Sequence, residues 1–285
     1  EGWFFTWTPS EIQAVAGTAA LETYRTVYGI TERGNFEGRN IPYLPRPLAD
    51  SARSLKLPVA DLKTQIRNIN AALYQARAQR PPPILDDKIL TSWNGLMISA
   101  FARAGRVLAI PRYVRRAEKA AAFILENLRT RDGRLRRTWR NGRSKLNGYL
   151  DDYAFFIAGL IELYESSGQI KWFQAAQSLQ RLQDQHYGDE VGGYYTTSDD
   201  HETLLVREKP DYDGAEPSGN SVSAMNLLRL HAFTSNDDFR QKADKIFGLF
   251  TQSLSRGSTG QPALLSALDM RLDSPLQVVL VAPKK

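Results

Sequence analysis

The sequence predicts a mainly α-helical protein, an (α/α) toroid of helical hairpins with short β-hairpins on one rim. Three observations lead to this prediction. A helix that is apolar on nearly every side occurs three times, at 93–108, 153–164 and 222–233. An amphipathic helix follows each of them, and a segment rich in glycine and aromatic residues leads from one pair to the next. This alternation is typical of inner helices, buried all round, and outer helices with one solvent face.

The outer helices fix the register of the repeat. Their apolar stripes begin at Tyr113, Trp172 and Phe239, which gives steps of 59 and 67 residues. Twenty residues before each of these positions lies the start of an inner helix, at Trp93, Asp152 and Gly219. We therefore expect parallel inner helices whose N-terminal ends share one rim with the connecting segments.

The remaining elements follow from local signals. Thr8-Pro9-Ser10-Glu11 is a capping-box pattern that opens a predicted helix over 9–28, and a second helix is expected over 60–79. Residues 30–58 are rich in glycine and proline and predict an irregular connection. We expect one toroid domain over 1–285. Short β segments are expected at 131–135, 190–195 and 276–281.

The composition narrows the possible chemistry. The chain has 285 residues, 42% of them hydrophobic, and no cysteine, which excludes disulfides, thiolate nucleophiles and cysteine-bound metals. No segment approaches the roughly 18 consecutive apolar residues of a membrane-spanning helix, so we expect no membrane partner and a cytoplasmic location. The chain begins at Glu1 without an initiator methionine, and we expect it to be a C-terminal fragment of a longer protein.

The positive charge is concentrated in one segment. The whole chain carries a net charge of +6, but residues 129–145 alone carry +7, from seven arginines, one lysine and Asp132. The only aromatic residue in that segment is Trp139, so nothing there offers a row of rings for stacked bases, and no nucleic-acid partner is expected. We expect a solvated hairpin. The alternative is that one or two of these arginines hold a carboxylate or phosphate of a ligand at the rim.

Acidic residues precede each inner helix. Asp86 and Asp87 lie before the first, Asp151 and Asp152 open the second, and Asp213 and Glu216 lead into the third. Carboxylates beside aromatic residues suit sugar chemistry, because a glycosidic bond needs a general acid and a second carboxylate, and sugar rings stack on flat faces. Acidic residues are also common helix caps, so each of them has a capping alternative.

Each candidate residue receives a role within this hypothesis. Asp152 is the first candidate for the general acid and base, Asp87 for the partner carboxylate, and Glu216 is the substitute. No histidine pair has metal-ligand spacing, so neither a metal nor a cofactor is expected. A carbohydrate or another small polar ligand would be bound by Trp93 and Tyr153 through stacking, by Asn94 and Asn220 through hydrogen bonds, and by Asp86, Asp151, Asp213 and Tyr194.

Several sequence strings resemble the YyaL family, which includes the spermatogenesis-associated thioredoxin-like proteins. The resemblance runs over nearly the whole chain, in order. It is carried by the strings Glu1-Gly2-Trp3-Phe4-Phe5-Thr6-Trp7-Thr8, Gly34-Asn35-Phe36-Glu37-Gly38, Asp86-Asp87-Lys88, Ser92-Trp93-Asn94-Gly95, Leu150-Asp151-Asp152-Tyr153-Ala154, Gly192-Gly193-Tyr194-Tyr195 and Asp213-Gly214-Ala215-Glu216-Pro217-Ser218-Gly219-Asn220-Ser221.

The resemblance implies a thioredoxin-like domain followed by a six-hairpin toroid similar to glycoside hydrolases and N-acylglucosamine 2-epimerases. It places the thioredoxin-like part and the first hairpins before Glu1, so this chain would carry an incomplete ring with open apolar surface. Self-association, or contact with the missing N-terminal segment, is then expected.

Three functions stay open at this stage. Those epimerases use histidines at the mouth, and no such pair is present, which favours acid chemistry resembling unsaturated glucuronyl hydrolases. The first expectation is therefore a hydrolase-like, carbohydrate-active domain. The alternatives are a non-catalytic scaffold or sugar-binding module that serves a thioredoxin-like domain, and an epimerase-like sugar isomerase.

Overall fold

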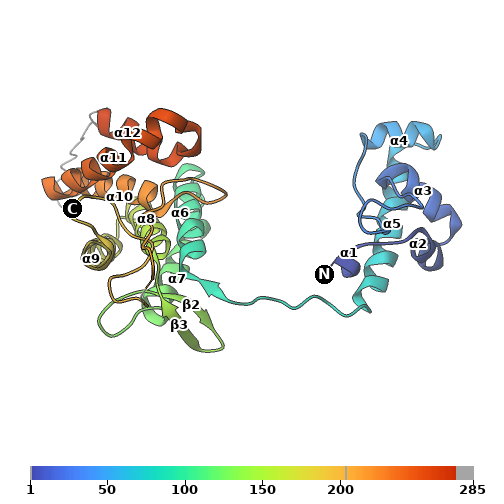
Figure 1. The fold of residues 1–285 in the computed structure, drawn as a ribbon. Helices are drawn as coiled ribbons and strands as arrows, with labels where there is room; N and C mark the ends of the chain where they lie inside the picture. Colours follow the sequence, from blue (N-terminus) through green and yellow to red (C-terminus); the bar gives the residue numbers. More distant parts are fainter. Residues whose placement is uncertain (1, 203, 274–285) are drawn as a thin grey trace, which may run out of the picture. The chain divides into compact units, whose positions relative to one another are not determined.

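A computed structural model of the chain describes residues 2–202 and 204–273. The chain divides into two compact units, Glu1–Asp86 and Asp87–Lys285 (Figure 1). The sequence predicts one toroid domain over 1–285. The division has a physical basis, because the clusters of buried apolar side chains each lie wholly within one unit.

The first unit is a small helical bundle. It contains α1 (Gly2–Phe5), α2 (Pro9–Ala16), α3 (Thr18–Tyr28), α4 (Leu48–Ser54) and α5 (Val59–Ala78). The capping box is formed as predicted, since the Glu11 backbone N–H donates to the Thr8 hydroxyl (3.2 Å) and the Thr8 N–H donates to the Glu11 carboxylate (2.9 Å).

Two predictions for this unit need correction. The helix predicted over 9–28 is two helices, because Gly17 adopts φ 87° and breaks the backbone path between α2 and α3. The connection predicted as irregular over 30–58 contains the helix α4. In this helix, Ala52 packs with Val27 and Leu62 in a small core. Burial of these apolar side chains stabilises the helix despite the flanking prolines.

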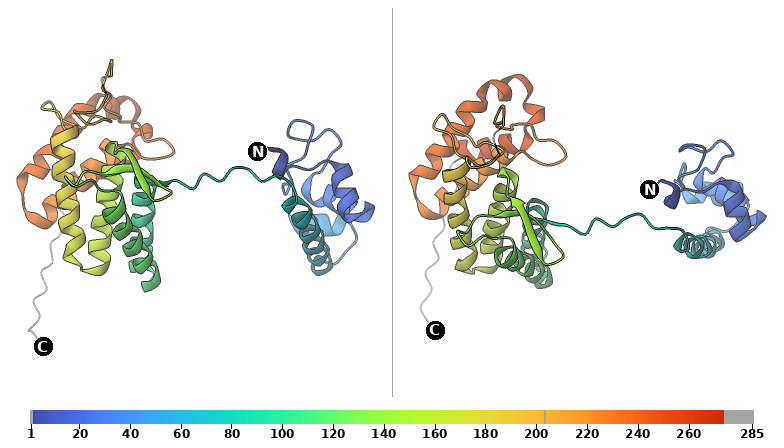
Figure 2. Two further views of the ribbon diagram at one scale, coloured as in Figure 1. Left: turned by 90° about the horizontal axis from the view of Figure 1, so that it is seen from below. Right: turned by 60° about the horizontal axis from the view of Figure 1, so that its bottom comes forward.

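The second unit is a succession of helical hairpins, as predicted for an (α/α) toroid. The hairpins are α6 (Thr91–Val107) with α7 (Pro111–Asn127), α8 (Leu150–Ser167) with α9 (Ile170–Tyr187), and α10 (Gly219–Thr234) with α11 (Asp237–Gly257). Each inner helix packs on its own outer helix, and α8 packs on both α6 and α10; Figure 2 shows α6 to α9 side by side. The mainly α-helical hairpin architecture is therefore confirmed.

One α-helix of the second unit was not predicted. A short 3₁₀ helix (Ser258–Gly260) leads into α12 (Pro262–Leu272), which packs on α10 through the buried Leu264 and Ala267. Its sequence shows little apolar periodicity over its 11 residues, so the pattern that revealed the longer outer helices is weak there.

The three inner helices differ in burial. Helix α8 is almost wholly buried, from Leu150 to Leu163, which is why its sequence is apolar on every side. Helix α6 was predicted to be buried all round as well, and this is wrong, because Trp93 is 57% exposed and Met97 is 53% exposed. Among the described helices, α7 and α8 are the ones that pack closely on α6.

A three-stranded antiparallel sheet accompanies the hairpins. Its strands β1 (Ile89–Leu90), β2 (Arg136–Arg140) and β3 (Arg143–Asn147) pair in the order β1-β2-β3. The segment predicted as a short β-hairpin at 131–135 is a tight turn closed by a single antiparallel bridge, Arg129 to Leu135, and the longer β2–β3 hairpin follows it. The segment predicted as a hairpin at 190–195 makes a single bridge, Gly188 to Tyr194, because its two glycines turn the backbone at positive φ. The run at 276–281 lies outside the described residues.

Within the described residues, no helix is both long and apolar enough to cross a membrane.

Candidate functional site

The N-terminal ends of α6, α8 and α10 gather the acidic and aromatic residues that the sequence singled out. Trp93 lies in the first turn of α6, Asp151 and Asp152 lie in the first turn of α8, and Glu216 lies in the loop just before α10. Contacts between these residues, and with Arg137 of β2, connect the three helix ends into one site. The site contains three carboxylates, one guanidinium and one indole ring.

Asp152 is at the centre of this site and is completely buried. Its Oδ1 accepts the backbone N–H of Ser92 (2.9 Å), and its Oδ2 accepts the backbone N–H of Tyr149 (2.9 Å) and a hydrogen bond from Arg137 (3.2 Å). Burial raises the pKa of Asp152 to about 6, although these hydrogen bonds and the charge of Arg137 oppose the rise. Both oxygens therefore hold the starts of α6 and α8 together.

Asp151 faces a different environment, one position earlier on α8. Its carboxyl group is partly buried and lies against the start of α10, where a side chain at Gly219 would come within 2.7 Å of Oδ1. Burial raises the pKa of Asp151. The charge of Arg137 and a hydrogen bond from the Gly219 backbone partly oppose this, and the negative charge of Glu216 adds to it. Asp151 and Glu216 are thus electrostatically coupled carboxyl groups at one helix end.

Trp93 and Glu216 form the exposed edge of the site. The indole Nε1–H of Trp93 donates to Oε1 of Glu216 (2.7 Å), which ties α6 to the loop before α10. More than half of the Trp93 side chain is nevertheless exposed. A large exposed ring held beside the Glu216 carboxylate can stack on the apolar face of a ligand while the carboxylate contacts its polar edge.

Three other predicted residues serve the architecture. Asp213 accepts the backbone N–H groups of Ser218 (2.7 Å) and Ala263 (2.8 Å). The buried Asn220 exchanges hydrogen bonds with the backbone of Tyr194. The hydroxyl of the buried Tyr153 accepts the backbone N–H of Leu135 (3.0 Å), so its ring lies in the core. The predicted roles of these side chains in ligand binding stay untested.

The remaining predicted residues lie apart from the carboxylate site. Asp87 forms an exposed ion pair with Arg140 on the β-hairpin. Asp86 is an exposed residue at the end of the first unit. The Asn94 amide donates to the Leu90 carbonyl (2.8 Å), and Asn94 also lines a groove of about 620 Å³ along α6 and α7.

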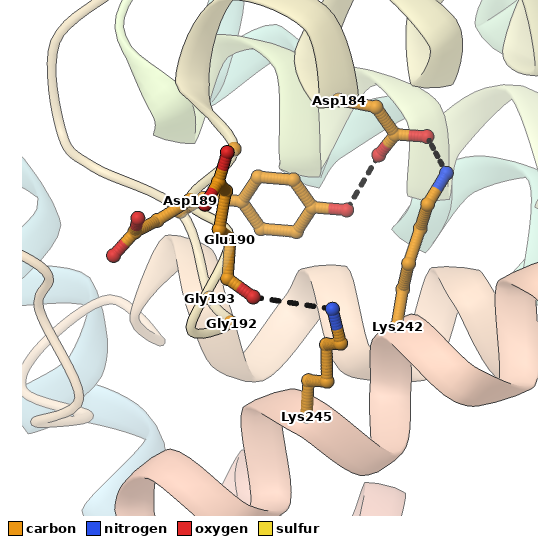
Figure 3. A pocket seen from close by; sticks show the side chains of 9 residues that line it. Asp184, Asp189, Glu190, Gly192, Gly193, Lys242 and Lys245 are labelled. Atoms are coloured by element: carbon orange, nitrogen blue, oxygen red, sulfur yellow. Dashed lines mark hydrogen bonds and ion pairs between the residues drawn. The ribbon is translucent and has the colours of Figure 1, made fainter.

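Tyr194 belongs to a separate pocket of about 290 Å³ between α9, the glycine turn and α11 (Figure 3). Its hydroxyl donates to Asp184 (2.6 Å), which also pairs with Lys242 (2.7 Å), and Lys245 donates to the backbone oxygen of Glu190 (3.1 Å). These contacts occupy the polar groups of the pocket and fasten the glycine turn to α11.

Sequence reasoning did not single out Arg137, Tyr149 or His201. The Arg137 guanidinium stacks on the Tyr149 ring (4.7 Å), and the other contact of that ring is His201 (5.5 Å between centroids). Arg137 is one of seven arginines in its segment, and only the strand register shows which of them turns toward Asp152. Arg137 bonds to the protein's own Asp152, so the alternative that one of these arginines holds a carboxylate or phosphate of a ligand stays a prediction.

One cluster in the described residues has the donor atoms for a metal ion. His186, Asp199 and Asp200 bring ligand atoms within 4.8 Å of one another. However, Asp200 forms a two-pronged ion pair with Arg134, which lowers the pKa of Asp200, and His186 bonds to Asp199 (3.0 Å). These protein partners satisfy the cluster, and the arginine charge opposes a cation there.

Comparisons with known proteins identify the relatives of the chain. No protein-family model matches it. Human spermatogenesis-associated protein 20 is 34% identical over the whole chain, and the rat protein of the same name is 34% identical over 98% of it. The chain is a homologue of spermatogenesis-associated protein 20. An uncharacterised protein of Caenorhabditis elegans is 30% identical over the whole chain. The predicted family relationship is thus confirmed, and the chain spans about 40% of the length of these relatives.

Solved structures with a similar arrangement of helices have a lower sequence identity to this chain. They include cellobiose 2-epimerase from Bacillus thermoamylovorans (16% identity, 57% of this chain and 44% of that one, TM-score 0.48). A family 105 glycoside hydrolase from C. acetobutylicum aligns over 72% of this chain and 61% of that one, with 11% identity and a TM-score of 0.48.

Proposed function

We propose that the second unit is a carbohydrate-active domain of the glycoside-hydrolase type. The observation that supports this most directly is the grouping of Asp151, Glu216 and the exposed Trp93 at one rim of the inner helices. A glycosidic bond is cleaved by a protonated carboxyl group and a second carboxylate, and an aromatic face binds the sugar ring.

Asp151 is the better placed general acid of the two adjacent aspartates. The sequence favoured Asp152, but both oxygens of Asp152 accept backbone N–H groups and its side chain is fully buried. Asp151 is partly exposed, so a ligand can reach it, and burial raises its pKa in the direction that a general acid needs. We assign proton donation to Asp151 and the positioning of its helix to Asp152.

The two carboxyl groups would divide the chemistry between them. Protonated Asp151 would donate its proton to the glycosidic oxygen as the bond to the leaving group breaks. Glu216, which accepts a hydrogen bond from Trp93, would supply the carboxylate that assists the attacking water or stabilises the positive charge on the sugar. Glu216 therefore takes the partner role that the sequence gave first to Asp87, which pairs instead with Arg140.

A non-catalytic sugar-binding or scaffold module is the second candidate. It is favoured by Asp152 and Asp213, each of which uses both carboxylate oxygens on backbone N–H groups and thereby builds the helix ends. In this case Trp93 would bind a ligand without turnover. A thioredoxin-like domain is the partner that such a scaffold would serve. An epimerase-like function is less well supported, because it would call for a pair of histidines at the mouth. Among the described residues, one histidine, His201, contacts this site, through the ring of Tyr149.

The test is turnover of a glycan panel by the full-length protein and four variants. We expect Asp151→Asn and Glu216→Gln to lower the rate by about 100-fold or more, as for the loss of a general acid or its partner. Asp87→Asn is the matched control and keeps the rate. If Asp152→Asn is the one variant that loses activity, the general acid is Asp152 and not Asp151. Sugar binding without turnover by the wild-type protein would contradict the hydrolase and favour the scaffold.

A further inference from the structure

The register of the β2–β3 hairpin determines on which of its two faces each cationic side chain lies. Its turn residues Asn141 and Gly142 both have positive φ (51° and 75°), which is the type I′ geometry of a two-residue hairpin. This turn places Arg140 directly opposite Arg143, and Thr138 opposite Lys145. Because side chains alternate along a strand, these four residues share one face of the hairpin.

The opposite face of the hairpin is the one that packs on the helices. Trp139 is paired with Ser144 there, and its ring meets Phe123 of α7 edge-on (5.2 Å between centroids). Arg137 also points to that side, where it bonds to Asp152. The outer face, with Thr138, Arg140, Arg143 and Lys145, is consequently turned away from the core.

The outer face is hollowed into a pocket of about 520 Å³. Its lining carries four cationic side chains and no carboxylate: Lys88, Arg140, Arg143 and Lys145, with Thr138 and Asn141. Asp87 pairs with Arg140, whereas no carboxylate of the described residues lies within ion-pair distance of Arg143 or Lys145. Cations placed directly opposite one another across two strands repel, and Asp87 offsets the charge of Arg140 but not the charges of Arg143 and Lys145.

We propose that this pocket, the hairpin pocket, binds a linear acidic polysaccharide through its carboxylate or sulfate groups. Arginine and lysine donors bind such oxyanions by charge-assisted hydrogen bonds. No aromatic residue lines the hairpin pocket, so it offers no ring on which a nucleic-acid base could stack. The choice of a glycan rests on the proposed function of the same unit, and the pocket serves as a second binding surface on the far side of the sheet from Asp152.

Binding of oligogalacturonate to the full-length protein tests this proposal. We expect the variant Arg143→Gln/Lys145→Gln to bind it about tenfold or more weakly than the wild type, the effect of losing two charge-assisted contacts. Heparin oligosaccharide, as a sulfated probe, separates sulfate from carboxylate recognition. The affinity for neutral maltohexaose should be the same for the wild type and for this variant.

The variant Arg115→Gln/Lys119→Gln is the control, because it removes the same charge from an exposed part of α7. Equal weakening in this control would show attraction to overall charge and overturn the proposal, as would absence of oligogalacturonate and heparin binding. Tighter binding of oligothymidylate than of either glycan, lost with Arg143 and Lys145, would identify a nucleic-acid surface instead. Acidic glycan binding without any hydrolysis would support the hairpin pocket and contradict the proposed function. Hydrolysis together with oligogalacturonate binding that is unchanged in Arg143→Gln/Lys145→Gln would support the proposed function and overturn the hairpin pocket.

Discussion

Asp151 and Asp152 are adjacent in the chain, yet their carboxyl groups face different surroundings. Successive residues of an α-helix are turned by about 100°, so one of the pair points between the helix starts and the other toward α10. Asp152 is fully buried and satisfies the backbone N–H groups of Ser92 and Tyr149. Asp151 is partly exposed beside Glu216. One residue therefore stabilises the site while its neighbour can meet a ligand.

The structural role of Asp152 predicts a large loss of stability on truncation. Asp152→Ala leaves two backbone N–H groups and the Arg137 guanidinium without their acceptor, which lowers the free energy of unfolding by about 3 kcal/mol. Asp87→Ala removes only an exposed ion pair and lowers it by less than about 0.5 kcal/mol. Urea denaturation at pH 7 measures both values, and similar losses for the two variants would contradict the assignment.

The pKa of Asp152 also predicts a pH dependence. Its folded pKa of about 6 lies above the ordinary 3.8, so between these values the folded state binds more protons than the unfolded state. The stability that comes from protonation of Asp152 in the folded state is therefore present at acidic pH and is lost as the pH rises through 6, whereas its hydrogen bonds to Ser92 and Tyr149 remain. Relative to Asp152→Asn, the wild type should gain about 2 kcal/mol between pH 7 and pH 4.5. A constant difference over this range would show that the pKa is not raised.

The sequence could identify the acidic residues of the site but not their individual roles. The positions of Asp151, Asp152 and Glu216 before or at helix starts follow from the apolar periodicity, which locates those starts. Which aspartate turns inward depends on the packing of α6 and α10 around α8, and this comes from residues far apart in the chain. The position of Arg137 depends likewise on the register of a hairpin whose turn lies four residues later.

At the scale of the elements, two glycines set the distance between α6 and α8. A side chain at Gly95 would lie 2.5 Å from the backbone of Phe155, and one at Gly159 would lie 2.9 Å from the backbone oxygen of Gly95. These distances are shorter than any carbon side chain tolerates, so the two inner helices pack backbone to backbone. The close approach brings Ser92 within hydrogen-bonding distance of Asp152.

Gly95→Ala should therefore disturb both stability and the site. The added methyl group forces α6 away from α8, and we expect the free energy of unfolding to fall by about 2 kcal/mol or more. Gly248→Ala is the matched control, since it adds the same methyl group to an exposed position of α11 with open space around it. That change should raise stability by up to about 1 kcal/mol. Equal effects would contradict the close packing of α6 and α8.

The longer helices were predictable for a physical reason. An amphipathic stripe repeats every 3.6 residues, and in α7 and α11 this stripe is long and clean, so both helices were located within a few residues of their ends. The helix α4 and the break at Gly17 were missed, because their formation depends on a small core and a single backbone dihedral. The exposure of Trp93 on α6 could not be predicted either, since an apolar sequence does not reveal which neighbours are present.

At the scale of the whole molecule, each unit has buried apolar clusters of its own. The clusters around Ile12 and Leu62 belong to residues 1–86, and the large cluster around Phe156 belongs to residues 87–285. The candidate carboxylate site and the hairpin pocket both lie within the second unit. The functional proposals therefore concern that unit.

Separate cores predict separate unfolding. A fragment of residues 87–285 should fold cooperatively and unfold at the urea concentration of the corresponding transition in the whole chain, because its core is contained within it. Circular dichroism at 222 nm follows both transitions. A fragment that lacks cooperative unfolding would show that this unit needs residues 1–86 to fold.

The central claim is that Asp151, beside Glu216 and Trp93, acts as the proton donor in glycan cleavage. The most direct measurement is the ratio of kcat/KM for Asp151→Asn and Asp87→Asn, in the full-length protein and on the glycan that the wild type cleaves. The account predicts a ratio of about 0.01 or less, with both variants unfolding at the wild-type temperature. A ratio near one would contradict it.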